Sequence, residues 1–352
     1  MTYPLRSIVL LMLGLLSGGW GSPPYALVAE NLPDDRWTDA EEQVLTNIRQ
    51  LTEEDMGLTK SGEAYFSPDM KRIIFQAFPK GEDAYQMFTL ELASDGKAVP
   101  ESLKQVSPSG GACTCGFFRP DGKGIIFGSS YLHPDMPNPN SYHRKGSSYT
   151  WDMPGGMDII AAEFDGSNPR QLTTTKGYDA ECAFSPDGKS IVFSSDRAGN
   201  PDLYVMKADG SGVRRLTDKA GYDGGPFFSP DGKRIIFRAD RKEDDHLQIF
   251  VINADGGGEQ QITQHASVVN WAPYWLPEGK SVVFTTSLHG HHNYEVYLLN
   301  IETGKQQRVT FRPRFDGLPV ISPDGKKMMW TSQRGGGNSQ IFIADFKTPP
   351  GF

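Results

Sequence analysis

Short runs of apolar, β-branched and aromatic residues alternate along the chain with small polar residues. These runs are four residues long and are flanked by segments with Gly, Asp and Asn, and examples lie at 87–90, 203–206, 249–252, 296–299 and 341–344. β-branched and aromatic residues favour strands, whereas Gly, Asp and Asn favour turns. The pattern therefore predicts many short strands joined by tight turns, and no long helix.

A Pro-Asp or Pro-Glu turn recurs six times between these strands. Its prolines are Pro68, Pro120, Pro186, Pro230, Pro277 and Pro323, and Gly-Lys usually follows. Proline presets φ in such a turn and glycine supplies a positive φ. Successive prolines are 44 to 66 residues apart, and three of the five separations are in the forties. A repeat of this length with several short strands is typical of a β-propeller.

Each repeat divides into four strands. The six copies of the fourth strand start one repeat earlier in the chain than the copies of the other three strands. The first copy, residues 49–52 (RQLT), precedes the first turn proline, and no copy follows the last third strand at 341–344. We therefore predict an all-β, six-bladed β-propeller of four-stranded blades over residues 47–346, followed by a tail at 347–352. The N-terminal strand completes the last blade and so removes an open sheet edge.

Composition and charge narrow the partners that this chain can have. The 352 residues include 39 Gly and 25 Pro, the net charge is −8, and the isoelectric point is near 5.4. An acidic chain without a long Lys/Arg run does not favour nucleic-acid binding. The repeat fills the chain length, so we expect one closed domain and a monomer.

The N-terminal residues resemble an export signal. Arg6 precedes an apolar stretch at 8–16 that is too short to span a bilayer comfortably. We expect residues 1–29 to be a signal peptide, cleaved after Ala29 or near Gly21 and Ser22, and residues 30–46 to be a short polar segment. No later stretch is apolar enough to cross a membrane, so the prediction is a periplasmic or secreted protein.

An acidic set at equivalent positions is the first candidate site. Seven or five residues before the turn prolines stand Glu63, Asp179, Glu181, Asp223 and Asp316. The first strand of each propeller blade lines the central channel, so these acids are expected to meet at one channel mouth and bind a partner there. A cation or a basic peptide fits such a site. The alternative is that the aspartates cap local turns or pair with a neighbouring Arg.

An insertion in blade two is the second candidate site. Pro120 is 38 residues from Asp158, whereas the matching distance is 17 residues in blade one and 16 in blade three. The excess falls at about 130–157, the blade-two insertion. Long loops on rigid scaffolds often bind partners. Its candidate partner-binding residues are Tyr131, His133, Tyr142, His143, Trp151 and Asp152. Alternatively, Trp151 and Tyr149 pack the loop onto its own blade.

Cysteines and histidines leave several readings open. Cys113, Cys115 and Cys182 are free thiols, or Cys115 and Cys182 form a cross-blade disulfide, or they belong to a metal or redox site. His289, His291 and His292 lie in a turn of blade five and match no closed set of metal ligands. No nucleophile–base pair is visible. We therefore expect no catalytic residue, no cofactor and no metal site, apart from a cation at the channel mouth.

The repeat resembles that of the TolB-like propeller family, also described as WD40-like or PD40 repeats. The resemblance rests on residues 184–189 (FSPDGK), 193–197 (FSSDR), 199–206 (GNPDLYVM) and 215–217 (RLT), and extends over all six repeats. TolB itself is a periplasmic propeller that contacts the peptidoglycan-associated lipoprotein. Its α/β domain before the propeller has no counterpart in residues 30–46.

The resemblance implies a function as well as a fold. It implies an exported, non-catalytic scaffold that binds a protein or peptide of the cell envelope. The family's relatives also include oligogalacturonate lyases and propellers attached to hydrolases. The alternative is therefore a channel-centred polysaccharide lyase or hydrolase, which could depend on a metal.

Overall fold

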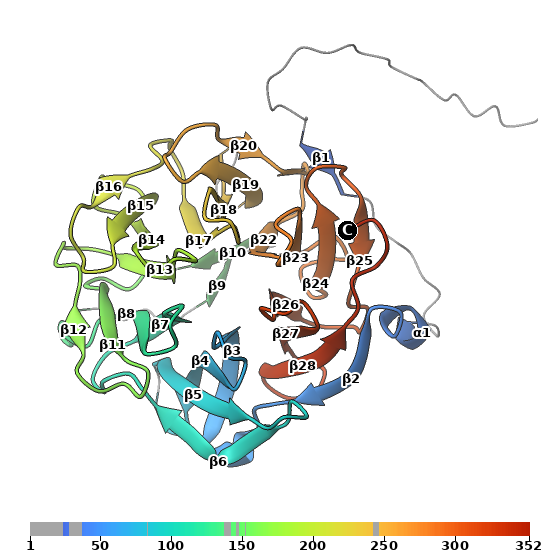
Figure 1. Ribbon diagram of the computed structural model, residues 1–352, viewed down its shortest axis with the longest axis horizontal. Coiled ribbons are helices and arrows are strands. Elements are labelled where there is room, and N and C mark those ends of the chain that lie inside the picture. Colours follow the sequence, from blue (N-terminus) through green and yellow to red (C-terminus); the bar gives the residue numbers. More distant parts are fainter. Residues whose placement is uncertain are drawn as a thin grey trace, which may run out of the picture.

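The computed structural model describes residues 24–27, 37–82, 84–136, 142–145, 148–151, 153–241 and 246–352. Six four-stranded sheets form a ring around a central channel (Figure 1). The predicted all-β, six-bladed propeller is confirmed. Among the described residues, no helix is long and apolar enough to cross a membrane.

The first three blades follow one another along the chain, each with its first strand innermost. Blade one consists of β3 (Leu58–Phe66), β4 (Arg72–Pro79), β5 (Gln86–Leu92) and β6 (Ala98–Gln105). Blade two consists of β7 (Cys113–Phe118), β8 (Gly124–Ser129), β11 (Asp158–Glu163) and β12 (Arg170–Gln171). Blade three consists of β13 (Asp179–Phe184), β14 (Ser190–Ser195), β15 (Asp202–Lys207) and β16 (Arg214–Arg215).

The last three blades complete the ring. Blade four consists of β17 (Asp223–Phe228), β18 (Arg234–Ala239), β19 (Gln248–Asn253) and β20 (Gln260–Gln261). Blade five consists of β22 (Asn270–Trp275), β23 (Ser281–Thr286), β24 (Glu295–Asn300) and β25 (Gln306–Arg308). Blade six consists of β26 (Asp316–Ile321), β27 (Lys327–Ser332), β28 (Gln340–Phe346) and the N-terminal β2 (Leu45–Gln50).

The N-terminal strand closes the ring as predicted. β2 pairs antiparallel with β28, so the outer strand of blade six comes from the opposite end of the chain. The short helix α1 (Trp37–Glu41) precedes β2 beside blade six (Figure 1), and the 3-10 turn η1 (Glu54–Met56) follows β2. A further short strand, β1 (Tyr25–Ala26), pairs in parallel with β21 (Thr263–Gln264) after blade four.

Repeated side chains explain why the sequence folds into blades. The second strand of every blade contributes one aromatic side chain that is at most 1% exposed: Phe75, Phe127, Phe193, Phe237, Phe284 and Trp330. Just after the fourth strand, a hydroxyl accepts a hydrogen bond from the backbone of the third strand, for example from Leu203 to Thr217 at 2.9 Å. These repeats account for the Leu-Thr copies in the sequence.

Each innermost strand has a bulge at the same place. The residue five positions before the turn proline has φ between 49° and 57° in all six blades: Glu63, Cys115, Glu181, Gly225, Ala272 and Leu318. The pairing register with the second strand shifts there in every blade. A bulge breaks the alternation of side chains along a strand. Residues on either side of it therefore do not follow the simple rule that positions two apart face the same way.

Candidate functional site

The centre of the ring holds a small cavity at the level of these bulges. The six bulge residues with positive φ all line this cavity: Glu63, Cys115, Glu181, Gly225, Ala272 and Leu318. We call the layer that they form the channel floor. The cavity measures about 20 Å³, which is room for about one water molecule. Side chains therefore fill most of the channel at this level.

Aromatic side chains fill the layer next to the channel floor. Tyr65, Phe117, Phe227 and Tyr274 come from four different innermost strands and stand three residues before their turn prolines. Their ring centroids are 5.1 to 6.2 Å apart, from Phe227–Tyr274 to Tyr65–Tyr274. Such tilted and edge-to-face contacts are favourable packing. The described part of the channel is therefore a closed-bottomed pocket rather than an open pore.

Glu181 is the better satisfied of the two acids on the channel floor. It accepts hydrogen bonds from Arg238 at 2.9 Å, from Tyr222 at 2.7 Å and from Tyr178 at 3.0 Å. The backbone N–H of Gly225 also donates to it. A Cβ at Gly225 would lie 2.2 Å from Arg238, so glycine leaves room for the guanidinium. Arg238 therefore neutralises Glu181.

Glu63 has no such cation. Tyr65 donates to it at 3.2 Å and the Cys115 thiol is hydrogen-bonded to it. Among the described residues, no Lys, Arg or His lies within ion-pair distance of Glu63. Burial raises the pKa of its carboxyl, and the charge of Glu181 adds to the rise, whereas Arg238 acts against it. Two carboxyl groups and one Arg, Arg238, therefore line the channel cavity.

The three predicted aspartates lie elsewhere. Asp179 pairs with Arg197 at 3.0 Å, Asp316 pairs with Arg334 at 2.7 Å, and Asp223 pairs with Arg241. Each aspartate side chain is at most 1% exposed, and none lines the channel cavity. Only Glu63 and Glu181 meet on the floor, because the bulge separates the two sets. The alternative of pairing with a neighbouring Arg describes the geometry, and a role in partner binding stays a prediction.

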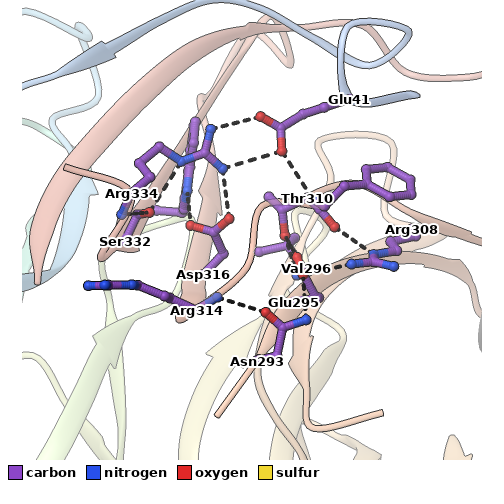
Figure 2. Close-up of polar contacts among 12 residues, drawn as sticks. Glu41, Asn293, Glu295, Val296, Arg308, Thr310, Arg314, Asp316, Ser332 and Arg334 are labelled. Carbon is purple, nitrogen blue, oxygen red and sulfur yellow. Dashed lines mark hydrogen bonds and ion pairs between the residues drawn. The ribbon is translucent and has the colours of Figure 1, made fainter. Parts of the chain in front are cut away.

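Burial dominates the electrostatics of these aspartates. It raises the pKa of Asp223 to about 6 and the pKa of Asp316 to about 6, although an Arg opposes the rise in each case. In Figure 2, Arg334 forks between Asp316 and Glu41, the last residue of α1. The N-terminal segment therefore contributes a buried carboxylate to the last blade.

A second acidic position, not singled out in the sequence, faces these aspartates across the blade junctions. The first residue of the third strand lies beside the residue that begins the next blade. The charge of Asp179 contributes to the raised pKa of Asp158, and the charge of Asp316 contributes to the raised pKa of Glu295. Between blades four and five, the two equivalent residues are uncharged, and Asn270 donates to Gln248 at 2.9 Å. A sequence signal for the Arg partners was present. In the three blades whose first strand begins with Asp, an Arg stands two residues after the second strand, at 197, 241 and 334.

The blade-two insertion is partly described. Tyr142 and His143 lie on β9 (Tyr142–Lys145) and Trp151 lies on β10 (Ser148–Trp151), two strands that pair as a hairpin. Viewed down the ring axis, this hairpin projects over the middle of the ring (Figure 1). Asp152 lies outside the described residues.

The first arm of the insertion is anchored to blade two. Tyr131 is half-buried and packs against the core of blades one and two. The His133 side chain is 45% exposed, and its Nε2 lies 3.1 Å from Asp158 Oδ2. Tyr131 therefore anchors this arm to the scaffold. The side chains of Trp151 and Tyr149 are not among those described, so their packing onto the blade and partner binding by the insertion both stay predictions.

All three cysteines are free thiols. The Cys182 thiol lies 3.8 Å from the carbonyl oxygen of Cys115, and both residues line the channel cavity. Burial raises the pKa of Cys113 to about 11 and raises the pKa of the other two thiols as well. These thiols are therefore protonated at neutral pH.

The His289 side chain packs against blade five rather than standing free in its turn. Its Nε2 lies 2.7 Å from the Tyr297 hydroxyl, and burial, together with Arg308, lowers its pKa to about 4. Within the described ranges, no group of three His, Cys, Asp or Glu side chains could hold a metal ion.

Comparison with solved structures finds the same fold in proteins of different activity. A protein assigned as TolB from Agrobacterium tumefaciens is 22% identical, with a TM-score of 0.58 over 82% of this chain and 91% of that one. TolB from Acinetobacter baumannii is 21% identical, with a TM-score of 0.57 over 82% of this chain and 64% of that one. An oligogalacturonate lyase in complex with manganese is 14% identical, with a TM-score of 0.50 over 85% and 93% of the two chains.

These likenesses show the fold alone, because a propeller supports many functions. The chain spans less than two thirds of the Acinetobacter protein. No curated protein matches the sequence. The family of the TolB beta propeller domain matches residues 148–264 and 259–349, which is more than half of the chain. The chain therefore belongs to the TolB beta-propeller domain family.

Proposed function

We propose that this protein is an exported, non-catalytic scaffold that binds a protein or peptide of the cell envelope. The apolar stretch at residues 8–16 behind Arg6 supports export to the periplasm or beyond. Membership of the TolB propeller family and the closed-bottomed channel support binding at one mouth of the ring. The blade-two insertion is the second part of the proposed surface.

One observation carries the proposal, namely that the Glu63 carboxyl has no ion-pair partner among the described residues. A buried carboxylate is costly without a cation, and its environment raises its pKa. Glu63 is half-buried rather than fully covered, so a Lys or Arg side chain of a peptide that reaches it from the channel mouth would supply the missing positive charge. Such charge-assisted hydrogen bonds are the stronger class, at about 1.5–3 kcal/mol each.

Aromatic side chains beside the channel floor fit the same kind of ligand. Arg238 lies 6.0 Å from the ring of Trp271, which is 6.3 Å from Tyr294 and 6.4 Å from Phe315. Trp271 and Phe315 are half-buried rather than fully covered. Rigid aromatic groups of this kind give peptide contacts at a low cost in side-chain entropy.

Peptide display against the purified protein tests the proposal. Enriched peptides are measured by fluorescence anisotropy on the wild type, on Glu63→Gln and on the control Glu101→Gln, which changes an exposed residue of β6. We expect enrichment of Lys or Arg, an affinity at least about tenfold weaker for Glu63→Gln, and no change for the control. The Gln variant keeps the shape of the site and should not lower thermal stability.

Two results would refute the proposal. The first is enrichment of peptides without a basic residue. The second is equal peptide affinity for the wild type and Glu63→Gln. Either result would show that Glu63 does not bind a basic side chain at the channel mouth. Turnover of a polysaccharide by the purified protein would instead support the lyase or hydrolase alternative.

A further inference from the structure

A groove between blades three and four opens on the face of the ring that carries the Pro-Asp turns. Its volume is about 350 Å³, within the range of small-ligand pockets. Half-buried side chains form its walls and an exposed carboxylate stands on either side of its rim: Ser190, Val205, Phe228 and Ala254, and Asp187 and Asp231. None of the residues that line this groove lines the channel cavity. The groove is therefore separate from the channel site proposed above.

Two other grooves between blades hold an Arg from the chain itself. Between blades four and five, the guanidinium carbon of Arg234 lies 5.0 Å from the centre of the Trp275 ring. Arg234 also donates to the carbonyl oxygen of Gly279 at 2.7 Å. Between blades one and two, the guanidinium carbon of Arg72 lies 4.7 Å from the centre of the Phe164 ring. Both Arg residues stand four positions after a turn proline, so the repeat provides an Arg site in its grooves.

Small side chains leave the groove between blades three and four open. Ser190 stands four residues after its turn proline, where the two other blades have Arg. Ala254 stands directly after the third strand of blade four, where blade two has Phe164. The chain therefore supplies neither the guanidinium nor the second ring that fill the other grooves.

Phe228 is the aromatic wall of this groove and corresponds to Trp275 in the next one, since both stand two residues before a turn proline. Of the six side chains at this position, Phe228 alone is half-buried. The other five are at most 9% exposed: Phe66, Phe118, Phe184, Trp275 and Ile321. The Phe228 ring is therefore left partly uncovered, whereas Arg234 lies over the ring of Trp275.

The two carboxylates at the rim attract a cation. Asp187 and Asp231 each accept a hydrogen bond from the serine that begins their turn, at 2.7 and 2.6 Å. These bonds are the main cause of the lowered pKa of both carboxyls, so both are ionised at neutral pH. Lys189 lies 3.5 Å from Asp187, but its side chain is 83% exposed, and such surface pairs contribute little. Lys233 and Arg234 act on Asp231 from the neighbouring turn in the same way.

Arg214 on the wall of the groove does not exclude a second guanidinium. It donates to the backbone carbonyl of Asp255 at 2.8 Å, so its own guanidinium is tied to blade four. Its counterpart in blade one is Lys104, whose Nζ lies 3.6 Å from Asp165. The groove beside Lys104 nevertheless holds Arg72. A cation at this position is therefore compatible with an Arg inside the groove.

We propose that this groove binds an Arg side chain of a partner polypeptide, in the place that Arg234 fills in the next groove. The guanidinium stacks on the ring of Phe228 and donates to the carbonyl of Gly232, the counterpart of Gly279. A planar guanidinium can stack and direct several N–H groups at once, whereas an ammonium is a point charge, so Arg fits the groove better than Lys. The groove and the channel share no residue, so this inference stands or falls separately from the proposed function.

A peptide titration of the full chain tests the inference. The probe is acetyl-Gly-Arg-Gly-amide, and the control peptide carries citrulline, an uncharged isostere, in place of Arg. The methyl NMR signals of Val205 and Ala254 report on the groove. We expect saturable shifts of both signals with the Arg peptide, and an affinity at least about tenfold weaker for the citrulline peptide. A peptide with Lys in place of Arg should also bind more weakly.

Variants show whether the peptide occupies this groove. Ser190→Arg places the chain's own guanidinium over Phe228, so it should abolish the shifts, whereas the matched control Ser190→Ala leaves the groove open and should bind as the wild type does. Phe228→Leu removes the ring and should weaken binding, which keeps the test decisive even if Ser190→Arg does not fold. The inference is overturned if the Arg peptide gives no saturable shift, if the citrulline peptide binds as tightly, or if folded Ser190→Arg binds like the wild type.

Discussion

Removing the Glu41 carboxylate should destabilise the last blade, because α1 contributes this group to a buried ion cluster. Glu41 is 2% exposed, and its Oε1 accepts from Arg334 at 2.7 Å. Its Oε2 accepts from Arg334 at 3.3 Å and from the backbone N–H of Phe311 at 3.0 Å. The helix before the ring-closing strand is thus tied to blade six and to the segment that follows blade five (Figure 2).

The size of the effect follows from what remains after Glu41→Ala. Breaking a buried ion pair costs about 3–5 kcal/mol. Arg334 keeps Asp316, so we expect the lower end of that range. The N–H of Phe311 loses its acceptor and adds about 1 kcal/mol. We therefore expect a loss of about 3–4 kcal/mol in the free energy of unfolding. Glu41→Gln keeps an acceptor for Phe311 and should cost less.

Urea unfolding monitored by tryptophan fluorescence measures this loss. The matched control is Glu42→Ala on the neighbouring exposed residue, which should change the free energy of unfolding by less than about 0.5 kcal/mol. If Glu41→Ala loses no more than the control, the buried cluster does not hold the N-terminal segment in place.

The same variant has a signature in pH. The pKa of Asp316 is raised to about 6, mainly by burial, with Arg334 opposing the rise and Glu41 adding to it. The folded protein therefore binds this proton more tightly than the unfolded chain. The stability from Asp316 is present below the ordinary aspartate pKa and is lost as the pH rises from about 4 to 6. Without Glu41 the pKa falls, so this decline in stability should shrink. A decline as large as that of the wild type would contradict the assignment.

Two further predictions concern ring closure and the thiols. A chain that starts at Glu53 lacks β2, so the edge of β28 is exposed. This shortened chain should aggregate or melt well below the full chain, and equal melting temperatures would contradict closure by β2. Cys113, Cys115 and Cys182 are protonated and at least half-buried, so a thiol reagent at pH 7 should label them slowly in the native protein and completely in urea. Rapid native labelling would show that the channel opens.

The sequence by itself determined the ring. Local signals specify it, because the Pro-Asp turns, the four-residue apolar runs and the Leu-Thr copies each act within a few residues. The displaced first copy of the fourth strand was enough to predict that β2 closes blade six. Glu63 and Glu181 were also found from the repeat, since equivalent positions of a propeller converge on its axis.

Only the tertiary structure decided which acids meet. The prediction placed Asp179 and Glu181 together because the first strand lines the channel, whereas the left-handed bulge at Glu181 separates their side chains. Partners such as Arg238 and His133 are distant in sequence from the carboxylates that they contact, so their distances, and hence their electrostatics, depend on how neighbouring strands and blades pack. Charge neutralisation is a property of that packing, which is why the carboxyl of Glu63 stands out only after folding.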